Sequence, residues 1–262
     1  MKKFELTAES KTNWLGRTLF RIKACVDFVT TSGDDVHKGD LGGFIEKENN
    51  LSQDGNAWVF GDARISGDAR ISGDARISGN ARIFGNAEIS DDARISGNAR
   101  ISGNAEIFGN AWVSDDARIS DDARISGNAR ISGNARISGN ARISDDARIS
   151  GNARISGNAR IFGNAEISDD ARISGNARIS GNAEIFSMKH FFCITPMGAE
   201  GYPLTVFRTK THELEVSFNF KIYQIDEFKK MVHDTWDDFY AYIAEEAINL
   251  TEKYIDLERK VE

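Results

Sequence analysis

A six-residue unit repeats without interruption through half of the chain, and it constrains the fold more than any other feature. From Gly55 to Phe186 the sequence consists of 22 copies of G-[ND]-A-R-I-S, with no insertion or deletion. Ala occupies position three of every copy, and Ile or Val occupies position five. Position four is Arg in sixteen copies, and position one is Gly or Asp. One local rule therefore governs half of the 262 residues.

The alternation Ala-Arg-Ile predicts a short strand with Ala and Ile on one face and Arg on the other. Ser-Gly-Asn or Ser-Asp-Asp then supplies a turn, because Gly, Asn and Asp tolerate the bent conformations that a corner needs. A period of six matches no helical face, and Gly every six residues would interrupt a helix. We expect a solenoid in which three consecutive hexads close a triangle. The 22 hexads give about seven coils, and such coils are stable only as a stack.

Written from its aliphatic position, the unit is I-S-G-N-A-R, which resembles the hexapeptide repeat of the left-handed parallel β-helix. The preceding segments GRTLFRIKA (16–24) and GDLGGFIEKENNLSQDGNAWV (39–59) look like the leading part of the YdcK-type bacterial and phage β-solenoids. The resemblance implies a left hand, whereas chain sterics favour right-handed crossovers. It implies no established activity. The expected fold is an all-β solenoid, a three-sided left-handed parallel β-helix with a cap at each end.

The segments outside the repeat are predicted to be these caps. Residues 1–54 are expected to form a small β cap with a strand from Phe20 to Phe28, whose apolar residues alternate with polar ones, and with turn glycines in 39–44. Residues 55–186 form the β-helix. Residues 187–262 are expected to form an α+β unit with strands 189–195, 204–209 and 214–220 and a helical tail from about Asp226. Caps make physical sense because an open coil presents unpaired strand edges.

Within the helical tail, apolar residues recur at helical spacing and predict an amphipathic helix that Asp237 or Asp238 can start. The predicted apolar stripe consists of Phe239, Ile243, Ala247, Leu250, Tyr254 and Leu257. Tyr240, Tyr242 and Ile248 lie off this stripe and are the candidates for a second seam that faces a partner. Aromatic residues beside a polar rim often anchor interfaces.

A column of arginines is the second candidate binding surface. Position-four residues three hexads apart should stack, and one such column contains arginine alone. It consists of Arg64, Arg82, Arg100, Arg118, Arg136, Arg154 and Arg172. At about 4.8 Å per strand the column would span roughly 29 Å and could meet an anionic polymer. Because Arg fills most position-four sites, the column can equally arise by chance.

Catalytic and metal-binding patterns are weak. Residues 55–186 contain no His, Cys, Lys, Tyr or Thr, and the four histidines lie in the flanks, so a coil-borne acyltransferase site is not expected. His190 and Cys193 form an H-x-x-C pair that a strand would place on opposite faces. Five hexads begin with Asp-Asp, but no two of these pairs are three hexads apart, so no carboxylate ladder for calcium is predicted. Catalytic residues, metal ligands and cofactors are all predicted to be absent.

Residues 79–108 and 157–186 are identical, and their offset of thirteen hexads rotates the second copy by one side of the triangle. The net charge of −7 does not indicate a nucleic-acid binder, and no apolar run or leader indicates a membrane or secreted protein. We expect a cytoplasmic, non-enzymatic interaction scaffold that binds an unidentified protein partner, or itself, through residues 187–262. The alternatives are an acyltransferase-like hexapeptide-repeat enzyme and a self-assembling polymer.

Overall fold

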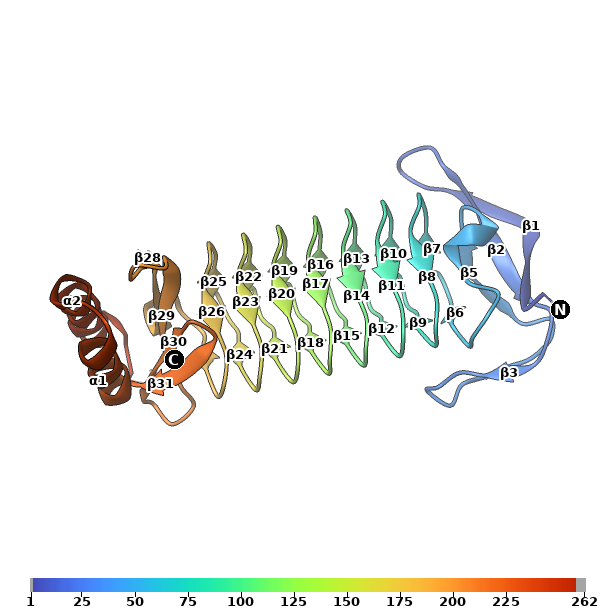
Figure 1. Cartoon of the computed structure of the whole chain (residues 1–262). Helices are drawn as coiled ribbons and strands as arrows, with labels where there is room; N and C mark the ends of the chain where they lie inside the picture. The colour runs from blue at the N-terminus through green and yellow to red at the C-terminus, as the bar shows by residue number, and fades with distance from the viewer. Residues whose placement is uncertain (1, 258–262) are drawn as a thin grey trace. The chain divides into compact units, whose positions relative to one another are not determined.

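A computed structural model describes residues 2–257 of the chain (Figure 1). The chain forms two compact units, Met1–Asn140 and Ala141–Glu262. The parallel β-solenoid predicted from the repeat is confirmed within each unit. The last five residues of the predicted C-terminal domain, 258–262, lie outside the described residues.

The first unit begins with antiparallel structure. Its opening elements are β1 (Phe4–Thr12), β2 (Thr18–Ala24), β3 (Phe28–Val29), β4 (Asp35–Val36), β5 (Leu41–Ile45) and the 3-10 turn η1 (Glu48–Asn50). Strand β2 pairs antiparallel with both β1 and β5, and β3 pairs antiparallel with β4. The strand predicted from Phe20 to Phe28 therefore ends early, at Ala24, because the chain turns there into the β3–β4 hairpin.

Each hexad of the first unit contributes one two-residue strand made of positions four and five. These strands are β6 (Trp58–Val59), β7 (Arg64–Ile65), β8 (Arg70–Ile71), β9 (Arg76–Ile77), β10 (Arg82–Ile83), β11 (Glu88–Ile89), β12 (Arg94–Ile95), β13 (Arg100–Ile101), β14 (Glu106–Ile107), β15 (Trp112–Val113), β16 (Arg118–Ile119), β17 (Arg124–Ile125), β18 (Arg130–Ile131) and β19 (Arg136–Ile137).

These strands stack into three parallel sheets in which neighbouring hexad strands are three hexads apart, as the triangular coil predicts. The sheets run β5-β7-β10-β13-β16-β19, β8-β11-β14-β17 and β6-β9-β12-β15-β18. The parallel stack starts before the first hexad, because Phe44 and Ile45 of β5 pair with Arg64 and Ile65. Strand β5 therefore provides the parallel edge with which a strand of the first coil pairs.

The second unit continues the same pattern with β20 (Arg142–Ile143), β21 (Arg148–Ile149), β22 (Arg154–Ile155), β23 (Arg160–Ile161), β24 (Glu166–Ile167), β25 (Arg172–Ile173), β26 (Arg178–Ile179) and β27 (Glu184–Ile185). Its parallel sheets are β20-β23-β26, β21-β24-β27 and β22-β25.

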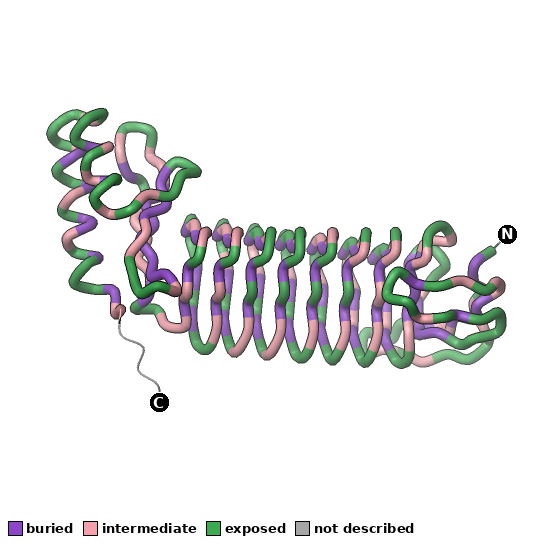
Figure 2. The backbone as a smooth tube through the Cα atoms, turned by 90° about the horizontal axis from the view of Figure 1, so that it is seen from below, coloured by how far each residue is buried: buried purple, intermediate pink, exposed green. Residues whose placement is uncertain are grey.

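The physical basis of the repeat is now visible. Every position-three Ala and position-five Ile or Val is at most 1% exposed, so the inner faces of each unit form an apolar core (Figure 2). Backbone hydrogen bonds join each coil to the next: Arg64 N donates to Ala81 O, Ser66 N to Ile83 O and Asp68 N to Gly85 O, at 2.8–2.9 Å. Apolar burial and three inter-coil hydrogen bonds per hexad both require a neighbouring coil.

One prediction about position four is wrong. The repeat pattern puts position four on the outside, but Trp58, at position four of the first hexad, is 1% exposed. Phe28 and Phe4 approach its ring edge-on, with centroids 5.5 and 6.5 Å away. The N-terminal strands cover this first face of the coil, so Trp58 belongs to the core of the cap.

The expectation that residues 39–44 contain turn glycines holds only for Gly39, whose φ is +98°. Gly42 and Gly43 lie in β5, and each is packed too closely for a side chain. A Cβ on Gly42 would lie 2.6 Å from Val59 O, and one on Gly43 would lie 2.7 Å from Ala63 O. These glycines allow β5 to approach the first coil.

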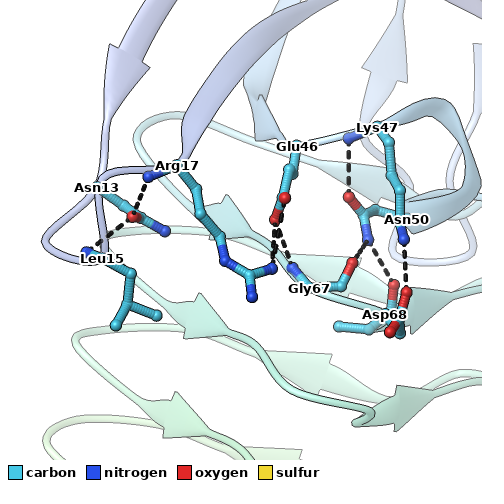
Figure 3. A network of polar contacts seen from close by, with 9 residues as sticks. Asn13, Leu15, Arg17, Glu46, Lys47, Asn50, Gly67 and Asp68 are labelled. Atoms are coloured by element: carbon cyan, nitrogen blue, oxygen red, sulfur yellow. Dashed lines mark hydrogen bonds and ion pairs between the residues drawn. The ribbon is translucent and has the colours of Figure 1, made fainter.

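A polar network fastens the cap to the first coil (Figure 3). Glu46 accepts from the Gly67 amide at 2.6 Å and from Arg17 at 3.0 Å. Asn50 donates to the Gly67 and Ala69 carbonyls at 3.0 and 2.8 Å. These side chains satisfy corner groups that no earlier coil can reach.

The C-terminal part of the second unit is an antiparallel sheet with two helices. It comprises the 3-10 turn η2 (Met188–His190), β28 (Phe191–Met197), β29 (Tyr202–Arg208), β30 (Leu214–Phe218), β31 (Lys221–Gln224), α1 (Ile225–Thr235) and α2 (Asp238–Tyr254). The sheet order is β28-β29-β30-β31. The three predicted strands are present within two residues at each end, whereas β31 was not predicted. The predicted helix start is confirmed, because the Asp237 carboxylate accepts from Tyr240 N.

The sheet docks on the last coils through β29. Thr205 accepts from the backbone amide of Arg178 at 3.1 Å, Lys210 N donates to Asn182 O at 3.0 Å, and Ala183 bridges to Thr209. The edge of the final coil is thereby paired rather than open, which is how natural sheets avoid edge-to-edge association.

Candidate binding surfaces

The arginine column is assembled by strand register within each unit. In the first unit Arg64, Arg82, Arg100, Arg118 and Arg136 pair residue for residue along one sheet. In the second unit Arg154 pairs with Arg172 on β22 and β25, and both side chains are exposed.

The start of the column is covered. The tip of the β1–β2 hairpin lies over Arg64 and Arg82, and Trp14 of this tip meets Phe84 edge-on at 6.5 Å. Arg64 and Arg82 are accordingly half-buried, whereas Arg100, Arg118 and Arg136 are exposed. In the described residues these last three make no ion pair. The accessible cationic surface of the first unit is therefore shorter than the sequence pattern indicated.

The four glutamates at position four lie outside the arginine column, Glu88 and Glu106 on β11 and β14 and Glu166 and Glu184 on β24 and β27, and each has a cationic partner. Glu88 and Glu106 are neighbours in register, but each has an arginine on its other side: Arg70 lies 3.6 Å from Glu88 and Arg124 lies 3.0 Å from Glu106. In the second unit Glu166 pairs with Arg148 at 2.8 Å. Hydrogen bonding from Lys210, and then from Arg148, lowers the pKa of Glu166.

Helix α2 shows the largest departure from the prediction. Ile248, expected on a partner-facing seam, is fully buried, and the predicted apolar stripe is largely exposed. The exposed large residues of the helix are Phe239, Tyr242, Ile243, Leu250 and Tyr254, which we call the α2 outer face. Of the three helix candidates, Tyr242 lies on this face, 59% exposed, and Tyr240 is half-buried.

Small residues explain the inversion. Ala241, Ala244 and Ala247 join Ile248 and Thr251 on the buried side of α2. Of these, Ala244, Ala247 and Ile248 form the core of the C-terminal part with residues of α1 and the sheet, among them Phe228, Val232, Val206 and Val216. Alanines allow close packing of the helix, so this side buries better than the bulkier stripe that periodicity selected.

A pocket of about 430 Å³ lies beside the N-terminus of α2, between the β28–β29 turn and the end of α1. The buried Phe218 and the half-buried Tyr223, Trp236 and Tyr240 line this pocket. Glu200 and Asp237 bring carboxylates to the rim. Aromatic faces and carboxylates together suit a cation with an apolar stem. The pocket residues come from strands, turns and helices between residues 198 and 240, so sequence spacing gave no signal for it.

His190 and Cys193 do not form a catalytic pair. His190 lies in η2, is 2% exposed, accepts from Phe186 N and packs edge-on against the Phe186 ring. Burial, reinforced by Arg208, lowers its pKa. Burial raises the pKa of the Cys193 thiol, which leaves it protonated and a poor nucleophile.

The Asp-Asp corners have a structural role. The first Asp of each pair has a positive φ of 50–61°, the value that Gly adopts elsewhere at this position. Asp91, Asp115, Asp121 and Asp145 each accept from the backbone amide of the Gly one coil later, at 2.9–3.0 Å. In residues 2–257 no cluster of three or more His, Cys, Asp or Glu side chains could hold a metal ion.

Comparison with known proteins shows which family of repeats this sequence resembles. The family model of the YdcK β-solenoid repeat matches residues 63–76, 75–91, 93–106, 99–115, 123–139, 129–145, 147–160, 153–169 and 171–184. Over these segments, between residues 63 and 184, the chain is similar to the YdcK β-solenoid repeat. No curated protein matches the chain at a significant level.

The YdcK repeat carries no known catalytic function. The matched segments exclude both flanking parts, so the α2 outer face and the aromatic pocket lie outside the YdcK repeat. Within residues 2–257 no helix combines the length and apolar character that crossing a membrane requires. The handedness and the number of coils of this YdcK-type solenoid stay predictions.

Proposed function

We propose that the chain is a non-enzymatic cytoplasmic scaffold, in which the solenoid carries a C-terminal unit that binds a protein partner. The observation that supports this proposal is the α2 outer face. Five large apolar or aromatic side chains of one helix are 39–67% exposed. Soluble monomers rarely leave so contiguous an apolar stripe in water unless it serves an interaction.

The charge and apolar character of this surface indicate the kind of partner that would bind it. The aromatic pocket with Glu200 and Asp237 lies at one end of the α2 outer face and would take a Lys or Arg side chain. Residues 187–257 contain 7 basic and 12 acidic side chains, so their charge of −5 favours a basic partner. We therefore propose an amphipathic segment with apolar anchors and at least one basic residue.

A second copy of this chain is a less suitable occupant. An antiparallel pairing of two α2 outer faces would place Ile243 opposite Leu250, and it would bring the exposed Glu246 next to its own copy. Like charges that face each other across an apolar contact destabilise it. The arginine column remains an alternative surface for an anionic partner.

Two variants separate these surfaces. One carries Tyr242→Ser and Leu250→Ser, and the matched variant carries Arg100→Ser, Arg118→Ser and Arg136→Ser; all five side chains are exposed, so both chains should fold. We expect the first variant to lose a chemically cross-linked partner at least tenfold and the second to retain it. Loss only in the arginine variant would transfer the function to the column. A wild-type dimer in sedimentation analysis that the first variant dissolves would identify self-association instead.

A further inference from the structure

Because most hexads carry Arg at position four, each departure from Arg can be compared with the consensus and checked for a structural reason. Position four departs from Arg six times, at two Trp and four Glu. Trp58 is accounted for by the N-terminal core. The glutamates each face a cation: Glu88 faces Arg70, Glu106 faces Arg124, Glu166 faces Arg148 and Glu184 faces Arg208.

Trp112 is the departure for which the described residues offer no structural role. Its side chain is 46% exposed on the outer face of β15, and its indole Nε1 makes a long contact of 3.5 Å with Ser96 Oγ. The inner face of the same strand is already filled by Val113, which is fully buried. Arg occupies the equivalent position on the strands before and after it, which shows that the fold does not need an indole here.

The surroundings of Trp112 form a shallow site. Arg94 and Arg130 lie in register on either side of Trp112, one strand away in each direction. Both guanidinium groups are exposed and make no ion pair in the described part of the chain. Two cations therefore flank one flat aromatic face.

The β3–β4 hairpin supplies a wall. An open pocket of about 280 Å³ is lined by Trp112, Arg94, Ser78 and Ser96 from the solenoid and by Ser32 and Asp34 from the hairpin. The hairpin is held in place because Asp34 accepts from Arg76 Nε at 2.6 Å and Thr31 donates to Asp74 O. Asp34 thus neutralises Arg76 and leaves Arg94 available to a ligand.

We propose that this pocket binds an acidic oligosaccharide that contains hexuronate units. A pyranose ring stacks on the Trp112 indole, because its C–H groups fit an electron-rich aromatic face. Arg94 and Arg130 bind the uronate carboxylates, for which the planar guanidinium is well suited. The hydroxyls of Ser78 and Ser96 and the Asp34 carboxylate meet sugar hydroxyls as donors and acceptors.

The same features disfavour a nucleic acid. Single strands also stack on aromatic rings, but they require a continuous basic track along the backbone. Here Asp34 lies on the wall of the pocket, and the chain carries a net charge of −7. A ligand with many hydroxyls and separated carboxylates fits this mixture of charges better than a polyphosphate.

The decisive variant is Trp112→Arg, which restores the residue that position four carries in sixteen hexads and should therefore fold as well as wild type. Calorimetric titration of the full chain with oligogalacturonate and oligoguluronate, alongside neutral maltohexaose, measures the site. We expect at least one acidic sugar to bind, and Trp112→Arg to weaken that binding at least tenfold without a change in melting temperature. Arg94→Ser should weaken binding and reduce its salt dependence, whereas Arg118→Ser, on another face, should leave both unchanged.

Three results would overturn the proposal. These are no measurable heat with either acidic sugar at millimolar concentration, equal binding by Trp112→Arg and wild type, and equal binding of maltohexaose and the uronates. An oligothymidylate that binds more tightly than the uronates would reassign the site to single-stranded nucleic acid.

Discussion

The guanidinium of Arg208 is completely buried and donates to the carboxylate of Glu184 at 2.5 Å. Glu184 begins the last strand of the repeat, and Arg208 ends β29, so the pair joins the final coil to the C-terminal sheet. The ring of Phe186 lies beside the same guanidinium at 5.1 Å. This buried cation depends on one carboxylate for its charge balance.

Glu184→Gln should therefore be strongly destabilising. The amide keeps the shape of the side chain but leaves a buried guanidinium without its counter-charge, which costs about 3–5 kcal/mol. Hydrogen exchange of the β27 and β29 amides, measured by mass spectrometry, should increase accordingly. The matched variant Glu106→Gln breaks an exposed pair with Arg124 and should cost below about 1 kcal/mol. Equal effects of the two substitutions would contradict the role of Arg208.

The Asp corners predict that the cost of replacing a corner Gly with Asp depends on whether Gly or Asp occupies the same corner one coil later. A Cβ on Gly103 would lie 2.6, 2.8 and 2.9 Å from the N, O and Cα atoms of Asp121, one coil later, whereas a Cβ on Gly85 would meet one atom below 3.0 Å, the Gly103 carbonyl oxygen at 2.9 Å. Gly85→Asp should be tolerated within about 1 kcal/mol, because Asp accepts a positive φ and can bond the Gly103 amide as Asp121 bonds Gly139.

Gly103→Asp should be much worse, because it stacks one aspartate directly on another and forces a backbone clash. We expect a loss of about 2 kcal/mol or more, in the range that buried strain and unpaired like charges produce. Urea unfolding of the two variants under one set of conditions makes the comparison. If Gly103→Asp is as stable as Gly85→Asp, the corner geometry does not explain why Asp-Asp pairs never occupy the same corner of successive coils.

The period of the repeat was sufficient to predict the coil, the buried Ala and Ile residues and the outward Arg side chains. Those features depend only on which side of a short strand a residue occupies. Trp58 and Ile248 were misassigned because their environment is set by distant segments: Phe28 covers Trp58, and the alanines of α2 bring Ile248 into the core. The aromatic pocket was missed for the same reason, since turns and helix ends far apart in the sequence build it.

A whole coil should be removable. Excision of residues 115–132 removes three complete hexads and rejoins Ser114 to Gly133, so every strand keeps its column and its inward Ala and Ile. Thermal unfolding followed by circular dichroism should then shift by only about 5 °C, the equivalent of one or two kcal/mol. Excision of residues 115–123, one and a half hexads, places the next Arg out of phase with the core and should abolish cooperative unfolding. Similar melting of the two deletions would refute the six-residue hexad as the structural unit.

His190 should make the stability of the C-terminal part depend on pH. Burial first, and then the charge of Arg208, lowers the pKa of His190 below the 6.5 of a free imidazole. As the pH falls below about 6.5, His190 binds a proton more readily in the unfolded chain than in the folded chain. The free energy of unfolding that is present at neutral pH therefore decreases on acidification.

Substitution of His190 isolates this proton. His190→Asn cannot titrate, yet its side-chain oxygen can accept from Phe186 N as the imidazole does. Urea midpoints between pH 7 and pH 5 should therefore fall less in this variant than in wild type. The matched variant His212→Asn replaces an exposed histidine with a φ of 63°, which Asn tolerates, and controls for the loss of one imidazole. Parallel slopes for wild type and His190→Asn would mean that His190 binds its proton equally well in the folded and unfolded chains.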